Sequence, residues 1–582
     1  MKKRTLLKKL TSGMLAAAMT LTCSQTMMAE EAYNGGEEFT ISVLCKEPES
    51  GIGAAELWWF KYAEWYLQQH GYNAKIEVQG AVDEAQSKAL ILATNNIPDL
   101  VWGNALTATE AVIYGQNDGV VLDWTPYLNE TNMPNAYKAM TGNLADAFIL
   151  NTTPDGKIYG LPYGIERGWG QAAGNAPGVN RTWINKTWLE QVGMENPTTV
   201  DELLDVLRAF KNEIKLEDGS EVVPLASVIY GDQNASQTFY QLMFMYMGFY
   251  GTTGFNYGNE PAIKDGEVVL PCYTEEMKEF LNVMHTMYTE GLISQDFCTM
   301  DGDTAKALAA AGRVGVWAGN LVDFNPEPYT DWISLNPLSS SVCDFAITSN
   351  HSPYQINRVW ASAETEHPEA LACLMDFLYT QEGQAAYMCG LPKGEDPLGM
   401  ISGYTWDEEK QGWTNDEIAR GEYESIATYQ YNVLSPCIYI GDNTGYMQWM
   451  YENAGLDIEV KFEQMEDPIT KETVEMKHNV EYNTENLDGY FRLSQAAAWD
   501  GHITTITLPE MYCSSEVNQK LTDLKTVIDA YVQENIAKFV VGTRSLDEFD
   551  SYMEELKAMG IEEELEIYRE GYATYMANYF GE

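Results

Sequence analysis

A regular alternation of strand-like and helix-like segments near the start of the chain constrains the fold more than any other feature. Residues 39–44 alternate apolar and polar side chains as a half-buried strand does, and residues 54–70 follow with apolar side chains at helical spacing. A second strand pattern (AKIEVQG), a second helix pattern (EAQSKALILATN) and a third strand pattern (PDLVWGN) come next. Strands separated by helices are typical of an α/β lobe with a mainly parallel sheet. We therefore predict an α/β fold.

Two helices can be placed with particular detail. The helix over residues 54–70 is apolar on two sides, so we expect it to be largely buried. Its Trp58 and Trp59 could offer ring faces to a sugar, but their helical spacing favours burial in the core. Farther along, Thr199 and Glu202 have the spacing of a capping box and predict that a helix begins there.

The carboxyl ends of the predicted strands are candidate binding positions. In open α/β sheets, ligands bind beyond these ends, which here carry Lys46, Glu47, Trp102 and Asn104. Trp102 could equally be a core residue, and both interpretations stay open. Glu47 and Asn104 could exchange hydrogen bonds with a polar ligand. We therefore name Glu47, Trp102 and Asn104 as candidate ligand contacts.

Other candidates lie near predicted connections between lobes. The glycine-rich stretch DGKIYGLPYGIERGWG breaks the alternation and carries Glu166, Arg167 and Trp169, which either point into a cleft or form an exposed ion pair beside a packed indole. Trp317 and Asn320 end another strand pattern, GVWAGN, and are favoured as ligand contacts.

Two further aromatic residues are weaker candidates. Trp360 and Tyr439 could contact a ligand, although core packing is favoured for both. The chemistry behind the aromatic candidates is stacking against the C–H face of a sugar ring, with carboxylates and amides binding its hydroxyls. A carboxylate-rich cleft could equally bind a cationic ligand.

Charge excludes one class of partner. The 582 residues include 35 Lys and Arg against 86 Asp and Glu, which gives a formal net charge of −51. A phosphate backbone or an anionic membrane surface would be repelled by this field, so we expect no nucleic-acid partner. The acidic residues are dispersed among apolar ones, which indicates a solvated acidic surface on a folded protein.

The first residues have the pattern of an export signal. Five basic residues precede a short apolar stretch, residues 14–21, which has the length of a signal h-region. Cys23 follows at the place where a bacterial lipoprotein is cleaved and acylated, although Thr20 and Thr22 depart from the usual lipobox. Cleavage after Ala29 is the alternative. We favour a cell-surface lipoprotein anchored at Cys23, with residues 1–35 as signal peptide and flexible tether.

The sequence does not support catalysis. Its 6 histidines are scattered without metal-ligand spacing, and no G-x-S-x-G or G-x-x-x-x-G-K-[ST] motif occurs. With this many carboxylates, a glycosidase pair stays unsupported but open. An isolated oxygen-ligand site near Asp301 and Asp303 is also open. We expect no enzyme activity, no cofactor and no metal site.

Several segments in order resemble the family 1 extracellular solute-binding proteins of bacterial ABC importers, the group that contains maltose-type binding proteins, and most of all its long Firmicute lipoprotein branch. Each segment alone shows mostly ordinary helix and turn patterns, but together they cover nearly all the chain that follows the signal. The segments include NNIPDLVWGN, DGKIYGLPYGIE, WINKTWLEQVGMENPTTVDELLDVLRAFK, LNVMHTMYTEGLISQDF, AGRVGVWAGN and HPEALACLMDFLYTQEGQAAYM.

The resemblance implies a two-lobed periplasmic-binding-protein type II fold, a monomer whose lobes are joined by two or three crossing segments. Lobe 1 would comprise residues 36–162 and 353–393, and lobe 2 residues 163–352 and 394–582. It also implies capture of a carbohydrate between the lobes and delivery to the permease subunits of an ABC importer. Two alternatives stay open, which are a ligand sensor for a membrane receptor and a secreted glycoside hydrolase.

Overall fold

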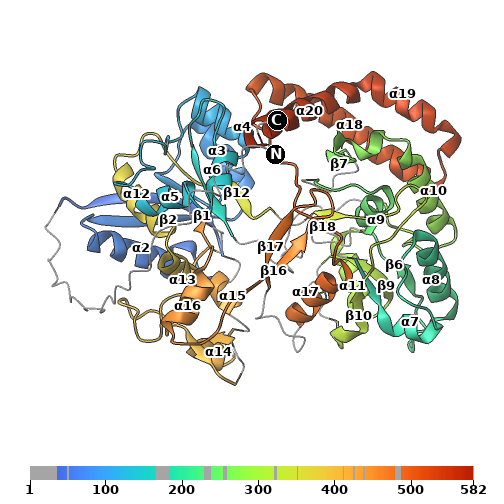
Figure 1. Ribbon diagram of the computed structural model, residues 1–582, viewed down its shortest axis with the longest axis horizontal. Coiled ribbons are helices and arrows are strands. Elements are labelled where there is room, and N and C mark those ends of the chain that lie inside the picture. The colour runs from blue at the N-terminus through green and yellow to red at the C-terminus, as the bar shows by residue number, and fades with distance from the viewer. Residues whose placement is uncertain are drawn as a thin grey trace, which may run out of the picture.

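The protein has two lobes that lie side by side (Figure 1). The computed structural model describes residues 36–48, 51–165, 182–228, 238–252, 259–319, 321, 324, 326–349, 352–409, 412–423, 426–436, 440–478 and 487–580. Mixed helices and sheets form both lobes, which confirms the predicted α/β class.

Lobe 1 is built on a sheet of six strands in the order β15-β4-β12-β3-β1-β2. The end of the sheet formed by β3, β1 and β2 is parallel, because β1 pairs with both β2 and β3 in the same direction. Strand β12 is antiparallel to β3 and β4, and β15 is parallel to β4. The first three strands confirm the predicted ones. The strands are β1 (Phe39–Lys46), β2 (Ala74–Ala81), β3 (Leu100–Trp102), β4 (Gly160–Gly164), β12 (Tyr354–Ala361) and β15 (Gly441–Asp442).

Helices cover this sheet and bury aromatic side chains against it. Trp59 on α2 is fully buried, and its ring meets that of Tyr387 edge-on with centroids 4.9 Å apart. Trp58 is also buried, so the predicted core position of both tryptophans is confirmed. The main helices are α2 (Trp58–Gln69), α3 (Glu84–Thr94), α4 (Ala108–Glu110), α5 (Pro134–Met140), α6 (Ala145–Leu150), α12 (Pro368–Phe377) and α13 (Gln381–Cys389).

Residues 394–460 also belong to lobe 1, which corrects the predicted boundary at residue 393. Strand β15 in this stretch pairs with β4 of the lobe 1 sheet. Tyr404, Met450 and Tyr451 pack with Ala385 of α13 in one apolar cluster. The elements of this stretch are β13 (Thr405–Asp407), β14 (Gly412–Thr414), α14 (Asp416–Ala419), α15 (Ile426–Tyr429) and α16 (Tyr446–Asn453).

Lobe 2 is built on a smaller sheet in the order β10-β5-β9-β6. The predicted capping box is present at α8, where Glu202 N donates to Thr199 Oγ1 at 3.1 Å. Asp301 caps α11 by accepting from Thr304 N at 2.8 Å. The strands are β5 (Thr182–Asn185), β6 (Val223–Leu225), β9 (Val314–Ala318) and β10 (Trp332–Ser334), and the main helices are α7 (Lys186–Val192), α8 (Val200–Glu213), α9 (Thr238–Met247), α10 (Glu276–Thr289) and α11 (Gly302–Ala310).

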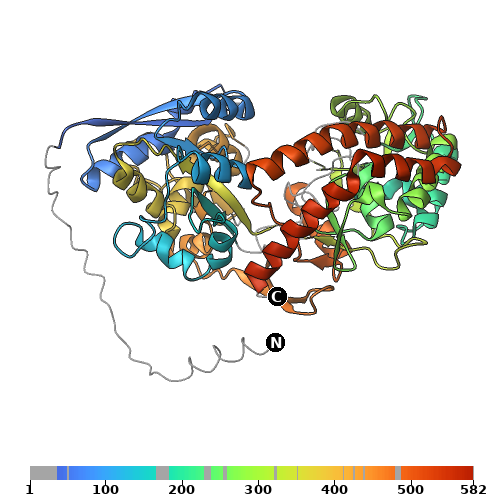
Figure 2. The same cartoon turned by 90° about the horizontal axis from the view of Figure 1, so that it is seen from above.

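The chain ends with a helical cover on lobe 2. Helices α18 (Ser515–Val541), α19 (Phe549–Met559) and α20 (Ile561–Phe580) pack on α10 and on the β7–β8 hairpin, and they extend toward lobe 1 (Figures 1 and 2). The hairpin strands are β7 (Ala262–Lys264) and β8 (Glu267–Val269). Before this cover come β16 (Lys461–Glu466), β17 (Thr473–His478), α17 (Leu487–Ala498) and β18 (Ile503–Thr504), the last of which pairs with β11 (Thr348–Ser349).

Three passages between the lobes can be followed from the residues that the structure describes. It leaves lobe 1 after β4 and returns just before β12, and Ile165 N donates to Pro353 O at 2.9 Å where these two passages meet. It leaves lobe 1 again between α16 and β16, over residues 454–460. The passage implied by the predicted boundary between residues 393 and 394 is therefore replaced by one about sixty residues later, because residues 394–460 complete lobe 1.

Candidate functional site

The carboxyl ends of the parallel strands of lobe 1 lie on the side that faces lobe 2. Strand β1 runs from the outer edge of lobe 1 toward the middle of the molecule (Figures 1 and 2). Because β2 and β3 are parallel to β1, their carboxyl ends share this inner side. The structure thus brings Glu47 and Asn104 to the edge where such sheets bind ligands.

Glu47 is held at this edge by its neighbours. Its side chain is half-buried, and its Oε2 accepts from Ala54 N at 3.3 Å. The carboxylate lies against Gly80, where an added Cβ would come within 1.4 Å of Glu47 Oε2. Glycine at position 80 therefore makes the room that this carboxylate occupies. The negative charge also acts on Cys45, because burial first and Glu47 second raise the pKa of that thiol to about 12.

Asn104 follows the neighbouring strand β3 and has structural bonds of its own. Its half-buried side-chain amide donates from Nδ2 to Glu84 O. Its backbone carbonyl oxygen accepts from Trp360 Nε1 at 2.8 Å. These bonds fix the loop that follows β3. A ligand at this edge would meet a loop that is already ordered.

Trp102 and Trp360 are core residues, which contradicts their predicted contact with a ligand. Both are 0% exposed. Trp102 Nε1 donates to Tyr387 OH at 3.0 Å, so its one polar atom is also used inside the lobe. A ring without exposed surface cannot stack on a ligand. For these residues the packing interpretation holds.

Trp317 is likewise buried, and the prediction of ligand contact fails for it as well. It is 0% exposed and packs edge-on against Phe324, with ring centroids 5.3 Å apart. Trp183 and Trp332 belong to the same cluster. The Nε1 of Trp317 has no hydrogen-bond partner among the described residues. The neighbouring Trp183 Nε1 donates to Gly319 O at 2.7 Å, which holds the turn after β9.

The remaining sequence candidates stay predictions. Glu166, Arg167, Trp169, Asn320, Tyr439 and the cysteine at position 23 lie outside the described residues.

Sequence reasoning missed a tyrosine pair on lobe 2. The rings of Tyr329 and Tyr490 have centroids 5.3 Å apart, and both side chains are half-buried. Tyr490 OH donates to Trp332 O at 2.9 Å, which joins α17 to β10. In Figure 1, α17 lies on the side of lobe 2 that is nearer lobe 1. No local pattern connects residues so far apart in the chain, so only the fold could reveal this pair.

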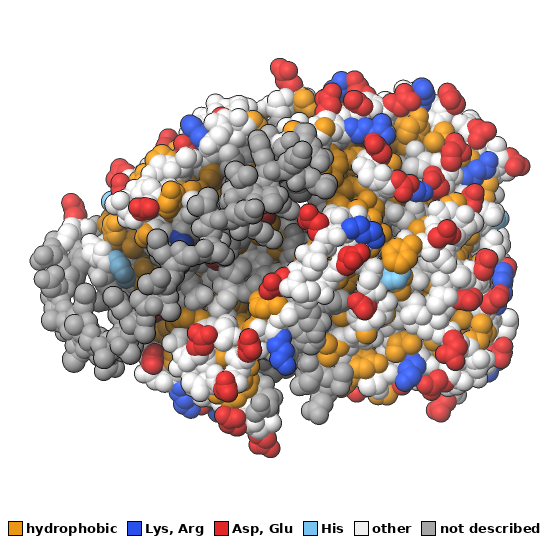
Figure 3. All heavy atoms as spheres, viewed as in Figure 1, with side chains coloured by type: hydrophobic (Ala, Val, Ile, Leu, Met, Phe, Trp, Pro, Cys, Tyr) orange, Lys and Arg blue, Asp and Glu red, His pale blue; other side chains and the backbone are white. Residues whose placement is uncertain are grey.

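The surface of the molecule is acidic on both lobes. Asp and Glu side chains are spread over the visible face of each lobe in Figure 3, with fewer Lys and Arg among them. This agrees with the dispersed acidic residues of the sequence. Such a surface disfavours nucleic acid as a ligand.

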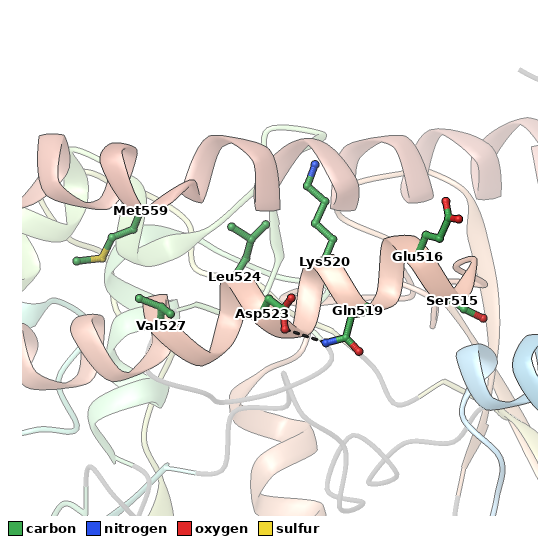
Figure 4. A pocket seen from close by; sticks show the side chains of 8 residues that line it. All are labelled: Ser515, Glu516, Gln519, Lys520, Asp523, Leu524, Val527 and Met559. Carbon is green, nitrogen blue, oxygen red and sulfur yellow. Dashed lines mark hydrogen bonds between the residues drawn. The ribbon is translucent and has the colours of Figure 1, made fainter.

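A groove runs along the outer side of α18 and is separate from the inner edge of lobe 1. Leu524, Val527 and Met559 give it an apolar floor, while Gln519 donates from Nε2 to Asp523 Oδ1 at 2.8 Å (Figure 4). The Lys520–Glu563 ion pair joins α18 to α20 beside it. These contacts hold the helical cover together.

Two general properties of the described residues bear on the protein's environment. No helix in that part of the chain has both the length and the apolar character needed to cross a membrane. The cysteines found there are free thiols that form no disulfide with one another.

Comparison with known proteins adds relatives of limited identity. The chain is 26% identical over 252 residues to the fructooligosaccharide ABC transporter substrate-binding protein FusA of Streptococcus pneumoniae, which covers 42% of this chain and 44% of that protein. It is 23% identical over 257 residues to the polygalacturonan/rhamnogalacturonan-binding protein YtcQ of Bacillus subtilis, which covers 43% of this chain and 45% of that protein. The chain thus matches less than half the length of these relatives.

Solved structures extend the likeness to nearly the whole chain. An HMO-binding, ABC-transporter-associated solute-binding protein from Bifidobacterium longum infantis has a TM-score of 0.71 and 20% identity, and the match covers 93% of this chain and 99% of that one. FusA of S. pneumoniae in complex with kestose has a TM-score of 0.67 and 18% identity, with 93% and 100% covered. At these identities the likeness establishes the two-lobed fold.

The family assignment follows from a match that spans both lobes. The family model described as bacterial extracellular solute-binding protein matches residues 61–392, which is more than half of the 582 residues. That stretch runs from within α2 to the end of α13 and so contains helices and strands of both lobes, together with the first two passages between them. The chain belongs to the bacterial extracellular solute-binding protein family.

Proposed function

We propose that this protein is the extracellular substrate-binding component of an ABC uptake transporter and that it captures a carbohydrate, most of all an oligosaccharide, between its lobes. The observation that carries the proposal is the pair of α/β lobes joined by three passages, in a chain whose curated relatives are named for binding fructooligosaccharides and polygalacturonan. The closed, loaded protein would then deliver its ligand to the permease subunits.

The proposed mechanism is a shift between open and closed arrangements of the lobes. Only a ligand that contacts both lobes gains more in the closed arrangement than in the open one, so only such a ligand favours closure. In lobe 1, the Glu47 carboxylate would accept hydrogen bonds from sugar hydroxyls. In lobe 2, the half-buried rings of Tyr329 and Tyr490 would pack on the C–H face of a sugar.

The candidates outside the described residues complete this proposed site. Glu166, Arg167 and Trp169 follow directly on the first passage between the lobes, and Asn320 follows β9. Tyr439 precedes β15. We propose that these residues add hydrogen bonds and a further ring face to the ligand site.

The proposal includes release of the ligand unchanged. The relatives are named as binding proteins, which supports a role without catalysis. A thermal-shift screen of residues 36–582 against sugars, oligosaccharides, amino acids, peptides and polyamines tests the function. Because a ligand stabilises in proportion to the logarithm of its concentration over its dissociation constant, a tight ligand should raise the melting temperature by several degrees.

The outcomes of this screen separate the candidate functions. An oligosaccharide that raises the melting temperature and is recovered intact by chromatography supports the proposal. Cleavage of that oligosaccharide would instead establish a hydrolase, and stabilisation by polyamines alone would overturn the carbohydrate assignment. With the oligosaccharide found, Glu47→Gln should weaken binding about tenfold, the cost of one charged hydrogen bond. Glu56→Gln, which removes an exposed carboxylate nearby, serves as control.

We also propose attachment to the cell surface through a lipid on Cys23. The relative named lipoprotein LipO of Bacillus subtilis, 23% identical over 313 residues, supports an anchored protein. Expression of the full chain with Cys23→Ser in a Gram-positive host tests the anchor. The variant should appear in the medium while the parent stays with the membrane fraction. Equal release of both proteins would support cleavage after Ala29 instead.

A further inference from the structure

A small pocket lies at the seam between the two lobes, apart from the inner edge that carries Glu47. Its volume is ≈ 180 Å³. Thr109 lines it from α4 of lobe 1, while Glu260, Glu510, Leu521 and Tyr568 line it from lobe 2 and its helical cover. Figure 1 shows α4 beside α20 at this place. Any molecule in this pocket would therefore touch both lobes.

Direct contacts hold the two sides of the seam together. Ala108 N on α4 donates to Glu510 Oε2 at 3.2 Å, and Asn117 Nδ2 donates to Ser515 Oγ at 3.4 Å. Residues 508–515 thus connect the lobe 2 body to α18 while they contact lobe 1 on the way. The two lobes are therefore in direct contact at the seam.

The charge in the pocket is negative and only partly balanced. Glu260 pairs with Lys525 at 3.1 Å, whereas Glu510 forms no ion pair within the described part of the chain. The charge of Lys88 acts on Glu510, but its ammonium group already donates to Glu110 Oε2 and Ala105 O, each at 2.7 Å. Packed protein removes enough water around Glu510 to raise the pKa of its carboxyl. A cation placed beside Glu510 would supply the missing charge.

The other walls of the pocket favour an apolar body. Leu521 and the ring of Tyr568 line it together with a second tyrosine, Tyr572. Lys525 Nζ lies 5.9 Å from the centroid of the Tyr568 ring and is paired with Glu260, so a ligand cation would be repelled from this side and drawn to Glu510 instead. A cavity of about 150 Å³ lined by apolar side chains can hold benzene, so the seam pocket has room for about six to eight non-hydrogen atoms.

We propose that the seam pocket is a second ligand site, which binds a small amphipathic cation with its ammonium group at Glu510 and its apolar body against Leu521, Tyr568 and Tyr572. A sugar ring with its hydroxyls exceeds the room available, and an anion would be repelled by the unpaired Glu510 carboxylate. Because the occupant contacts α4 and the helical cover together, its binding favours the arrangement of the lobes in which the seam is formed.

Three probes of one shape test the charge requirement. Benzylamine, benzyl alcohol and benzoate share an aromatic ring and carry a positive, a neutral and a negative group. Calorimetric titration of residues 36–582 at about pH 7, where the amine is protonated, should show benzylamine binding at one site. Benzyl alcohol should bind about tenfold more weakly, because it lacks the charged hydrogen bond, and benzoate should give no heat of binding.

Variants on opposite sides of the seam locate the binding. Glu510→Gln should weaken benzylamine binding about tenfold and leave benzyl alcohol unchanged. Thr109→Trp, made in lobe 1, should fill the pocket and abolish binding of both. Glu516→Gln removes an exposed carboxylate outside the pocket and is the matched control, which should bind like the parent.

Two results would overturn the proposal. One is benzylamine binding no tighter than benzyl alcohol. The other is benzylamine binding that both Glu510→Gln and Thr109→Trp leave unchanged, while thermal denaturation shows that both variants are folded. Neither result depends on the carbohydrate proposal, because no sugar is present in these titrations.

Discussion

A buried carboxylate in lobe 1 and one in lobe 2 are held in different ways. Asp376 on α12 accepts from Asn135 N at 2.8 Å, from Asn135 Nδ2 at 2.7 Å and from Ala136 N at 2.9 Å. Glu564 on α20 is 0% exposed and accepts from Asn259 Nδ2 at 3.2 Å, the same donor that serves Asp529 at 2.6 Å.

Burial raises the pKa of both carboxyls, but the two acids differ in their hydrogen-bond donors, because three donors serve Asp376 alone while Glu564 shares one donor with Asp529. In lobe 1, three donors let Asp376 fix the start of α5. In lobe 2, desolvation outweighs the attraction of Lys525, and the nearby Asp529 and Glu260 add repulsion, so the pKa of Glu564 is raised to about 7. We expect Asp376 to stabilise lobe 1 and Glu564 to make the helical cover of lobe 2 sensitive to pH.

Removal of the lobe 1 carboxylate should have the largest effect. Asp376→Ala leaves two buried backbone N–H groups of α5 without their acceptor, so we expect a loss of about 3 kcal/mol in the free energy of unfolding. Urea unfolding followed by tryptophan fluorescence measures it. Asp118→Ala, which removes an exposed acid of the same lobe, should change stability by less than about 0.5 kcal/mol. Equal effects of the two substitutions would refute the role of Asp376.

The lobe 2 carboxylate should make the stability of the protein depend on pH. Its folded pKa of about 7 lies above the ordinary value of 4.5, so the folded protein holds this proton more tightly than the unfolded protein does. The stabilisation by the protonated form is complete below pH 4.5 and is lost as the pH rises through 7. Glu564→Gln stays neutral and should therefore exceed the parent in stability by about 2 to 3 kcal/mol at about pH 8.

Urea unfolding of the parent and of Glu564→Gln at a series of pH values checks this expectation. The difference between them should shrink toward acid pH. A constant difference from about pH 5 to 8 would mean that Glu564 does not titrate in this window.

Some features of the fold could be predicted from the sequence and others could not. Local patterns predicted the first strands of lobe 1, the burial of Trp58 and Trp59 and the capping box at Thr199, because each depends on neighbours within a few turns. The assignment of residues 394–460 failed because their link to lobe 1 is a two-residue strand, β15, that pairs with β4 far away in the chain.

The candidate site was predictable only in part. Glu47 follows from the rule that ligands bind at the carboxyl ends of strands, and the structure places it there. Trp102, Trp317 and Trp360 have the same local setting but are buried by distant residues such as Tyr387. A local pattern does not tell whether tertiary packing covers a ring.

A smaller effect on stability is expected at the inner edge of lobe 1, where a substitution should mainly change ligand binding. Gly80→Ala would place a Cβ where Glu47 Oε2 now lies, so the flexible carboxylate must move. We expect about tenfold weaker ligand binding, as for Glu47→Gln, with stability lowered by about 1 kcal/mol at most. Calorimetric titration with the ligand measures the first effect and urea unfolding the second. Unchanged affinity would remove Glu47 from the site.

The smallest effect on stability is expected at the helix cap of α8, where a single exposed hydrogen bond can be compared with those of the buried acids. Thr199→Ala removes the cap of α8 and should cost about 1 kcal/mol in unfolding free energy. Thr199→Ser keeps a hydroxyl at the cap and should stay within a few tenths of a kcal/mol of the parent. If Thr199→Ala lowers the free energy of unfolding as much as Asp376→Ala does, the three hydrogen bonds to buried Asp376 stabilise the protein no more than one exposed hydrogen bond.

We propose that the two lobes together form one binding site for an oligosaccharide. Calorimetric titration of residues 36–582 with fructooligosaccharides and with fragments of polygalacturonan and rhamnogalacturonan tests this proposal. We expect one ligand molecule bound per protein for one of these classes, with affinity reduced both by Glu47→Gln in lobe 1 and by Tyr490→Ala in lobe 2. Binding that only one of the two substitutions weakens, or no binding by any oligosaccharide, would contradict it.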